Sequence, residues 1–78
     1  NERSAGEARF AVHFISASAT LASPKVSFHI ADEPDSGLDT NKQHLLASLY
    51  QVIAKSGRCV IIVTHRKDIY AGARVISI

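Results

Sequence analysis

The chain has 78 residues, of which 46% are apolar and 21% charged, and its formal net charge is +2 at neutral pH. This length allows one domain, and the apolar fraction argues against a disordered chain. The mild positive charge, with no basic stripe interleaved with aromatic residues, does not by itself indicate nucleic-acid binding. No apolar run reaches the about 18 residues of a membrane-spanning helix. The single cysteine, Cys59, excludes an internal disulfide and fits a reducing compartment.

The first periodic segment predicts a helix over residues 8–21. Its apolar residues at helical spacing are Phe10, Phe14, Ala17 and Leu21. The preceding Ser4-Ala5-Gly6-Glu7 has the S-x-x-E form of a capping box. The segment LASPK then ends the helix, because the residue before Pro24 is biased away from helical backbone.

The segment KVSFHIA, residues 25–31, predicts a strand. Its alternation places Val26, Phe28 and Ile30 on one face, which we expect to be the apolar face. Pro34 ends the strand because proline cannot continue the ladder of hydrogen bonds. The PDSGLD segment that follows has the composition of a turn.

A second helix is predicted over residues 41–55, with Thr40 and Gln43 as a capping box and Gly57 as the stop. Its expected apolar stripe consists of Leu45, Leu46, Leu49, Val52 and Ile53.

Two further strands are predicted in the last third of the chain. RCVIIVT, residues 58–64, is continuously apolar and β-branched, which suits a strand buried on both faces of a parallel sheet. Residues 65–73 are expected to form a loop or short helix, and RVISI, residues 74–78, a third strand. The order of helices and strands favours a parallel α/β sheet with right-handed connections.

Two adjacent carboxylates, Asp32 and Glu33, follow the first predicted strand. In open α/β sheets ligands bind beyond the carboxyl ends of the strands. Asp32 at such an end can hold magnesium directly or through water, and Glu33 can act as base or positioner for an attacking water. Adjacent side chains on extended backbone diverge, so the pair can serve metal and water separately. The alternative is an acidic turn with no chemical role.

His65 follows the buried strand over residues 58–64. If the two strands are neighbours, His65 and Glu33 share one rim of the sheet, where a histidine can donate to a phosphate oxygen. A single histidine after a strand is more often structural or exposed. The combination of Glu33 and His65, separated by one crossover helix, is a more specific indication of a site. The other histidines and Cys59 lack metal-ligand spacing.

Together these segments resemble the second half of an ATP-binding cassette (ABC-type) ATPase. ADEPDSGLD resembles the Walker B motif and D-loop, and VIIVTHR resembles the strand that ends in the switch histidine. The segment over residues 3–7 occupies the place of the signature motif. The resemblance divides the chain into a signature helix (1–22), Walker B strand and D-loop (25–39), crossover helix (40–56), switch strand and histidine (58–66) and final strand (74–78).

The resemblance implies a P-loop NTPase-like parallel sheet flanked by helices, present here as a partial domain with about three strands and two to three helices. It implies ATP and Mg²⁺ as ligands, with Asp32 in the metal shell, Glu33 as the catalytic carboxylate and His65 at the γ-phosphate. A second ATPase head is the implied partner. The residues implied to contact its nucleotide or lie at the head–head interface are Ser4, Gly6, Glu7 and Asp39. For these, helix capping by Ser4 with Glu7, and by Asp39, is the simpler alternative.

The sequence also departs from the family pattern. Arg3 and Ala5 replace a leucine and a glycine of the signature, His29 lies inside the Walker B strand, and Asp35 stands where Thr or Ala is common. The glutamine that normally lies before the signature is missing. No G-x-x-x-x-G-K-[ST] phosphate loop is present, and that loop supplies the phosphate cradle and a magnesium ligand. The chain opens and closes abruptly, so we expect a fragment that by itself hydrolyses little or no ATP.

Three kinds of ATP-binding cassette protein are compatible with the sequence. The DEPDSGLD and VIIVTHR segments resemble transporter nucleotide-binding subunits, whose partner is a membrane permease. Glu7 at the end of the signature and the FAVHFISAS helix favour instead SMC-like, recombination-repair or phage-defence ATPases, with DNA or a DNA-processing partner. A degenerate or split cassette acting as a non-catalytic interaction module is the third alternative. The expected localisation is cytoplasmic, at the membrane's cytoplasmic side for a transporter.

Overall fold

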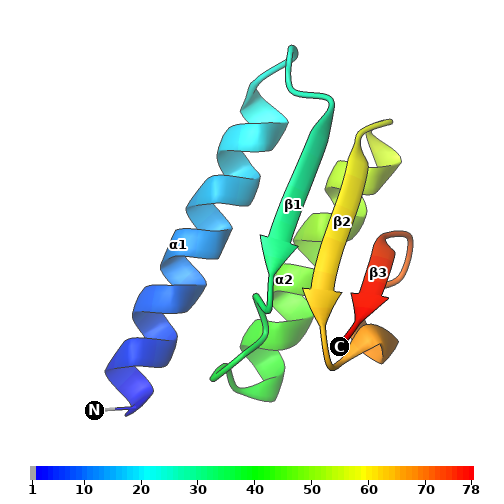
Figure 1. The fold of residues 1–78 in the computed structure, drawn as a ribbon. Helices are drawn as coiled ribbons and strands as arrows, with labels where there is room; N and C mark the ends of the chain where they lie inside the picture. Colours follow the sequence, from blue (N-terminus) through cyan, green and yellow to red (C-terminus); the bar gives the residue numbers. More distant parts are fainter. Residues whose placement is uncertain (1) are drawn as a thin grey trace.

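The computed structural model describes the backbone of residues 2–78 and the side chains of residues 6–78. Two helices cover one face of a three-stranded parallel sheet (Figure 1). In chain order the elements are α1 (Glu2–Ala22), β1 (Phe28–Asp32), α2 (Thr40–Lys55), β2 (Cys59–Thr64), the 3-10 helix η1 (Lys67–Ile69) and β3 (Arg74–Ser77). The strands lie in the order β1-β2-β3. The predicted parallel α/β architecture with three strands is confirmed.

Helix α1 begins earlier than the sequence predicts. It runs from Glu2, so Ser4 and Glu7 lie inside the helix and the predicted capping box ahead of residue 8 is wrong. Glutamate, alanine and arginine are strong helix formers, and apart from Gly6 nothing in this segment opposes helical backbone. Although α1 has 21 residues, no helix within the described chain combines the length and apolarity needed to cross a membrane.

Strand β1 buries the face opposite to the predicted one. His29 and Ala31 point towards the helices and are buried, whereas Phe28 and Ile30 remain 56% and 57% exposed. Alternation in a strand fixes which residues share a face but not which face meets the helices. The polar His29 is accepted in the core because Thr20 of α1 lies 2.8 Å from its Nδ1.

The second face of the sheet carries apolar side chains but no covering layer among the described residues. In β2, Val60, Ile62 and Thr64 are buried against the helices, while Ile61 and Val63 on the other face are only half-buried. The prediction that β2 is buried on both faces is therefore wrong for these residues. Parallel sheets occur almost only with both faces covered, so the uncovered face is the unusual feature of this fold.

Helix α2 begins at Thr40, and its N-cap is Asp39, whose side chain accepts a hydrogen bond of 2.8 Å from the backbone N–H of Lys42. The predicted capping box of Thr40 and Gln43 is wrong. The Gln43 side chain turns back instead to donate to the Leu38 carbonyl at 3.1 Å. An aspartate is at least as good a cap as threonine, so the cap moves one residue earlier. The predicted stop is confirmed: Gly57 has a φ of +93° just after the C-cap residue Ser56.

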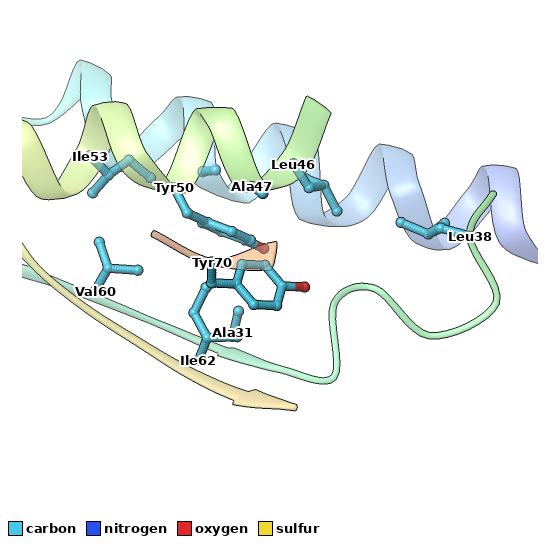
Figure 2. Close-up of a cluster of buried hydrophobic side chains, with 10 residues drawn as sticks. Ala31, Leu38, Leu46, Ala47, Tyr50, Ile53, Val60, Ile62 and Tyr70 are labelled. Atoms are coloured by element: carbon cyan, nitrogen blue, oxygen red, sulfur yellow. The ribbon is translucent and has the colours of Figure 1, made fainter. Parts of the chain in front are cut away.

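The core is formed where α2 packs on the sheet and against α1. Of the predicted apolar stripe on α2, Leu46 and Ile53 are fully buried, but Leu45 and Val52 are exposed. Ala47 and Tyr50 take their place, which rotates the buried stripe around the helix. Figure 2 shows the α2 side chains above Ala31, Val60 and Ile62 of the sheet, with the Tyr70 ring beside Tyr50.

His29 should make the stability of the chain depend on pH. Burial, with a smaller effect from nearby His13, lowers the pKa of His29 below its ordinary value of 6.5. Below pH 6.5 the unfolded chain therefore binds a proton that the folded chain excludes, and the free energy of unfolding falls as the pH falls. Urea unfolding followed by circular dichroism at pH 5, 6 and 7.5 measures this. We expect His29→Gln, which cannot titrate, to have a flatter pH dependence; equal slopes would contradict the assignment.

Candidate functional site

The ends of several elements meet at one edge of the molecule. The carboxyl ends of β1 and β2 and the N-terminal ends of both helices lie at the same end of the fold (Figure 1). Parallel pairing aligns Asp32, the last residue of β1, with Val63 of β2. The residues that follow the two strands therefore emerge side by side, at the edge where open α/β sheets bind ligands.

Glu33 and His65 are in contact at this edge. Glu33 Oε1 lies 3.2 Å from His65 Nε2. The prediction that the two strands are neighbours is confirmed. Glu33 and His65, which are 32 positions apart in the chain, lie on the same rim of the sheet as expected. Both side chains are accessible to a ligand, with 42% of the Glu33 side chain and 66% of the His65 side chain exposed. A contact this exposed contributes little to stability, because solvent screens it.

Asp32 and Glu33 diverge, but not by the predicted geometry. Asp32 completes β1 in extended conformation with an exposed side chain. Glu33 instead has a φ of +47°, a left-handed conformation that is uncommon for residues other than glycine, asparagine and aspartate. Its backbone N–H still donates to the Val63 carbonyl at 2.6 Å. Glu33 thus leaves the strand sharply, and its carboxylate turns to His65 rather than continuing the alternation of β1.

Gly6 explains how α1 reaches this edge. It is buried, and a Cβ at this position would lie 2.7 Å from the carbonyl oxygen of Gly37. The first turns of α1 therefore press directly against the turn that follows β1, where Gly37 itself has a φ of +75°. Glu7 follows with an exposed side chain. The Ser4 side chain lies outside the described residues, so its predicted role stays a prediction.

Asp39 has the capping role that the sequence offered as one of its two alternatives. One carboxylate oxygen accepts from Lys42 N, and the other lies 3.8 Å from the Lys42 ammonium. The side chain is nevertheless 63% exposed. Asp39 can cap α2 and also lie at a contact between two ATPase heads. Its place at such a contact stays a prediction.

A buried network below the rim was missed by the sequence analysis. Asp35, only 7% exposed, accepts hydrogen bonds at Oδ1 from the Thr64 hydroxyl at 2.8 Å and the Tyr70 hydroxyl at 2.7 Å. Asp35 stood out in the sequence only as a departure from a family pattern. A hydroxyl residue at the last position of an aliphatic strand was the available signal for Thr64.

The side chains of residues 6–78 do not form a complete metal site by themselves. Among the described residues, no group of three or more histidine, cysteine, aspartate or glutamate side chains converges on one point. Magnesium commonly takes one or two carboxylates and completes its shell with water and substrate phosphates. The donors at the edge, Asp32 with Glu33 nearby, therefore fit a magnesium ion that arrives with a nucleotide, and not a dedicated protein cage.

Comparisons with protein-family models, with curated proteins and with solved structures find no significant match to this chain.

The contact of Gly6 with Gly37 predicts that Gly6→Ala destabilises the chain. Forcing a methyl group into a packed backbone contact costs about 1–3 kcal/mol. In an open helix interior the same change would stabilise by roughly 0.5–1 kcal/mol, so the sign of the effect is diagnostic. The free energy of unfolding from urea titration measures it, with Ala11→Gly at an exposed position of α1 as the control for helix propensity. A Gly6→Ala chain that is more stable by the full roughly 0.5–1 kcal/mol of an open helix position would exclude the close approach.

Proposed function

We propose that these 78 residues form the Walker B, D-loop and switch-histidine part of an ABC-type ATPase domain, on a P-loop NTPase-like sheet. The observation that supports this most is the 3.2 Å contact between Glu33 and His65 at the carboxyl ends of two adjacent parallel strands. An acidic turn with no chemical role does not need a histidine from the next strand at its carboxylate. A site for water and phosphate needs both groups on one rim.

Each residue of the rim has one role in ATP hydrolysis. Glu33 orients the attacking water and accepts its proton. An ionised carboxylate has no hydrogen-bond donor, so it can only accept from the water. His65 donates from Nε2 to an oxygen of the γ-phosphate. In the structure that nitrogen faces Glu33, and since both side chains are largely exposed, a bound phosphate can take over the contact without disturbing the core.

Asp32 lies one residue before the proposed catalytic carboxylate and has an exposed side chain, which suits a ligand in the magnesium shell. The metal ion, when bound, neutralises charge that develops on the transferred phosphoryl group. Asp32 would hold that shell directly or through water, and Glu33 would be left to face the attacking water. The left-handed conformation of Glu33 separates the two tasks.

The proposal includes a second head. The nucleotide of one head would face the signature helix of the other, with Gly6 and the described part of α1 near the contact and the exposed Asp39 carboxylate at the interface. Gly6 packs against the backbone of Gly37, so the proposed signature helix and the proposed D-loop would touch within one head. The phosphate loop would come from a segment outside these 78 residues.

One observation favours a second candidate, a non-catalytic interaction module. The face of the sheet away from the helices is apolar, with Phe28, Ile30 and Ile76 each more than half exposed. Such a face can serve a partner protein whether or not ATP is hydrolysed. Transporter, genome-maintenance and defence ATPases all remain compatible with the site, so a permease, DNA or a DNA-processing partner are further proposals.

The Glu33→Gln variant tests the catalytic proposal in a protein that contains these residues together with a phosphate loop. We expect kcat for ATP hydrolysis to fall by about 10²–10⁴-fold, because glutamine cannot accept the proton of water. ATP affinity should be retained, since Glu33 acts on water and not on the nucleotide. Phosphate release and equilibrium ATP binding are measured in parallel.

Asp68→Asn is the matched control for the loss of one negative charge. Asp68 is exposed near the same edge and pairs only with Arg66 among the described residues. Its variant should hydrolyse ATP at the unaltered rate. Hydrolysis by Glu33→Gln at that same rate would refute the catalytic role and leave the interaction module as the better account.

A further inference from the structure

Three buried side chains tie the two halves of the rim together. We call Asp35, Thr64 and Tyr70 the Asp35 network. Asp35 Oδ1 accepts hydrogen bonds from both hydroxyl groups, at 2.8 Å from Thr64 Oγ1 and at 2.7 Å from the Tyr70 hydroxyl oxygen. These residues come from the turn after β1, the end of β2 and the residue after η1. One oxygen atom thus joins three segments that are distant in the sequence.

Thr64 fixes the start of the His65 loop. Its hydroxyl donates to Asp35 and, at the same time, accepts a hydrogen bond of 2.9 Å from the backbone N–H of Arg66. His65 lies between the residue that provides this hydroxyl and the residue that donates to it. The backbone on both sides of His65 is therefore held by a single buried group.

Asp35 fixes the Glu33 loop in the same way. Pro34, which is fully buried, lies between Glu33 and Asp35. The Asp35 carbonyl accepts from Leu38 N at 3.2 Å, and the Glu33 carbonyl accepts from Ser36 N at 3.2 Å. The turn is thus closed by its own backbone. Two hydrogen bonds anchor it to β2, one from the Glu33 N–H to the Val63 carbonyl and one from the Thr64 hydroxyl to the Asp35 side chain.

The donors of the network persist over the ordinary pH range. Burial raises the pKa of Tyr70, and its hydrogen bond to Asp35 raises it further, so the phenol stays protonated. Among the described side chains Asp35 forms no ion pair. The hydrogen bonds of a buried carboxyl group contribute little net stability, because burial also removes its hydration. What the network supplies is a fixed geometry.

We propose that the Asp35 network is a positioning element that sets the separation of Glu33 and His65. This inference rests on the proposed function for its purpose, but the geometric coupling itself does not require ATP. The two rim side chains are too exposed to be held by packing, so their backbone anchors determine where they meet. Misplacement of reacting groups by about 1 Å can cost about 10²-fold in rate, which is why the separation matters.

Nuclear magnetic resonance of the 78-residue chain tests the coupling without nucleotide. The probe is the chemical shift of the His65 imidazole at pH 7.5 and its change on Glu33→Gln. With the network intact we expect a clear change, because the carboxylate touches the ring. In the Thr64→Val background, which removes the hydroxyl but keeps the shape, we expect the response to Glu33→Gln to be lost.

Thr64→Ser is the matched control, since it keeps the hydroxyl, and the response should return. Circular dichroism and the melting midpoint show that each variant is folded. If Thr64 had only a structural role, its substitutions would lower the melting midpoint, but the His65 response to Glu33→Gln would not differ between Thr64→Ser and Thr64→Val. If Thr64→Val fails to fold, Tyr70→Phe removes the other donor and should weaken the response. A full response in folded Thr64→Val, or an equal loss in Thr64→Ser, would overturn the proposal.

The outcomes for positioning and for ATP hydrolysis are separate. If the response to Glu33→Gln survives in Thr64→Val while hydrolysis still requires Glu33, the positioning role is refuted and the proposed function stands. If the response is lost in Thr64→Val but hydrolysis is indifferent to Glu33, the network positions the pair and the catalytic assignment is refuted.

Discussion

The parallel pairing of β1 with β2 is the constraint on which the rest of the structure depends. Asp32, the last residue of β1, is aligned with Val63 of β2. Glu33 and His65 therefore emerge at the same edge of the sheet, where their side chains touch. Helix α2 makes this pairing possible by crossing over one face of the sheet, with Asp39 starting it and Gly57 ending it. The same crossover brings Gln43 back to the turn after β1, where it donates to the Leu38 carbonyl.

The buried core and the exposed rim lie in different parts of this small fold. The core lies between the helices and the covered face of the sheet, and it includes Tyr70, whose hydroxyl reaches Asp35. The exposed contact of Glu33 with His65 adds little to the free energy of folding. Between the two lies the Asp35 network, which is buried like the core but polar like the rim. It transmits the rigidity of the core to two side chains that packing cannot hold.

Much of this arrangement could be predicted from the sequence, because it depends on local patterns. The β-branched run before His65, the alternation before Asp32 and the helical period between them determine the elements and their parallel order. The buried face of β1 could not be predicted, since alternation alone does not say which side meets a helix. That His29 faces inwards depends on Thr20, a partner on another element. The Asp35 network was equally inaccessible, because its three members meet only after the strands and η1 have packed.

The central claim is that the rim formed by Glu33 and His65 holds the γ-phosphate of ATP and its attacking water. An experimental structure of the ATP-bound Glu33→Gln protein, including its phosphate loop, tests this most directly, because by the proposal the substitution slows hydrolysis and keeps ATP intact. The account predicts that His65 Nε2 lies within hydrogen-bond reach of a γ-phosphate oxygen, about 2.6–3.2 Å, and that residue 33 faces a water in line with it. A nucleotide bound away from this rim, with His65 remote from its phosphates, would contradict the account.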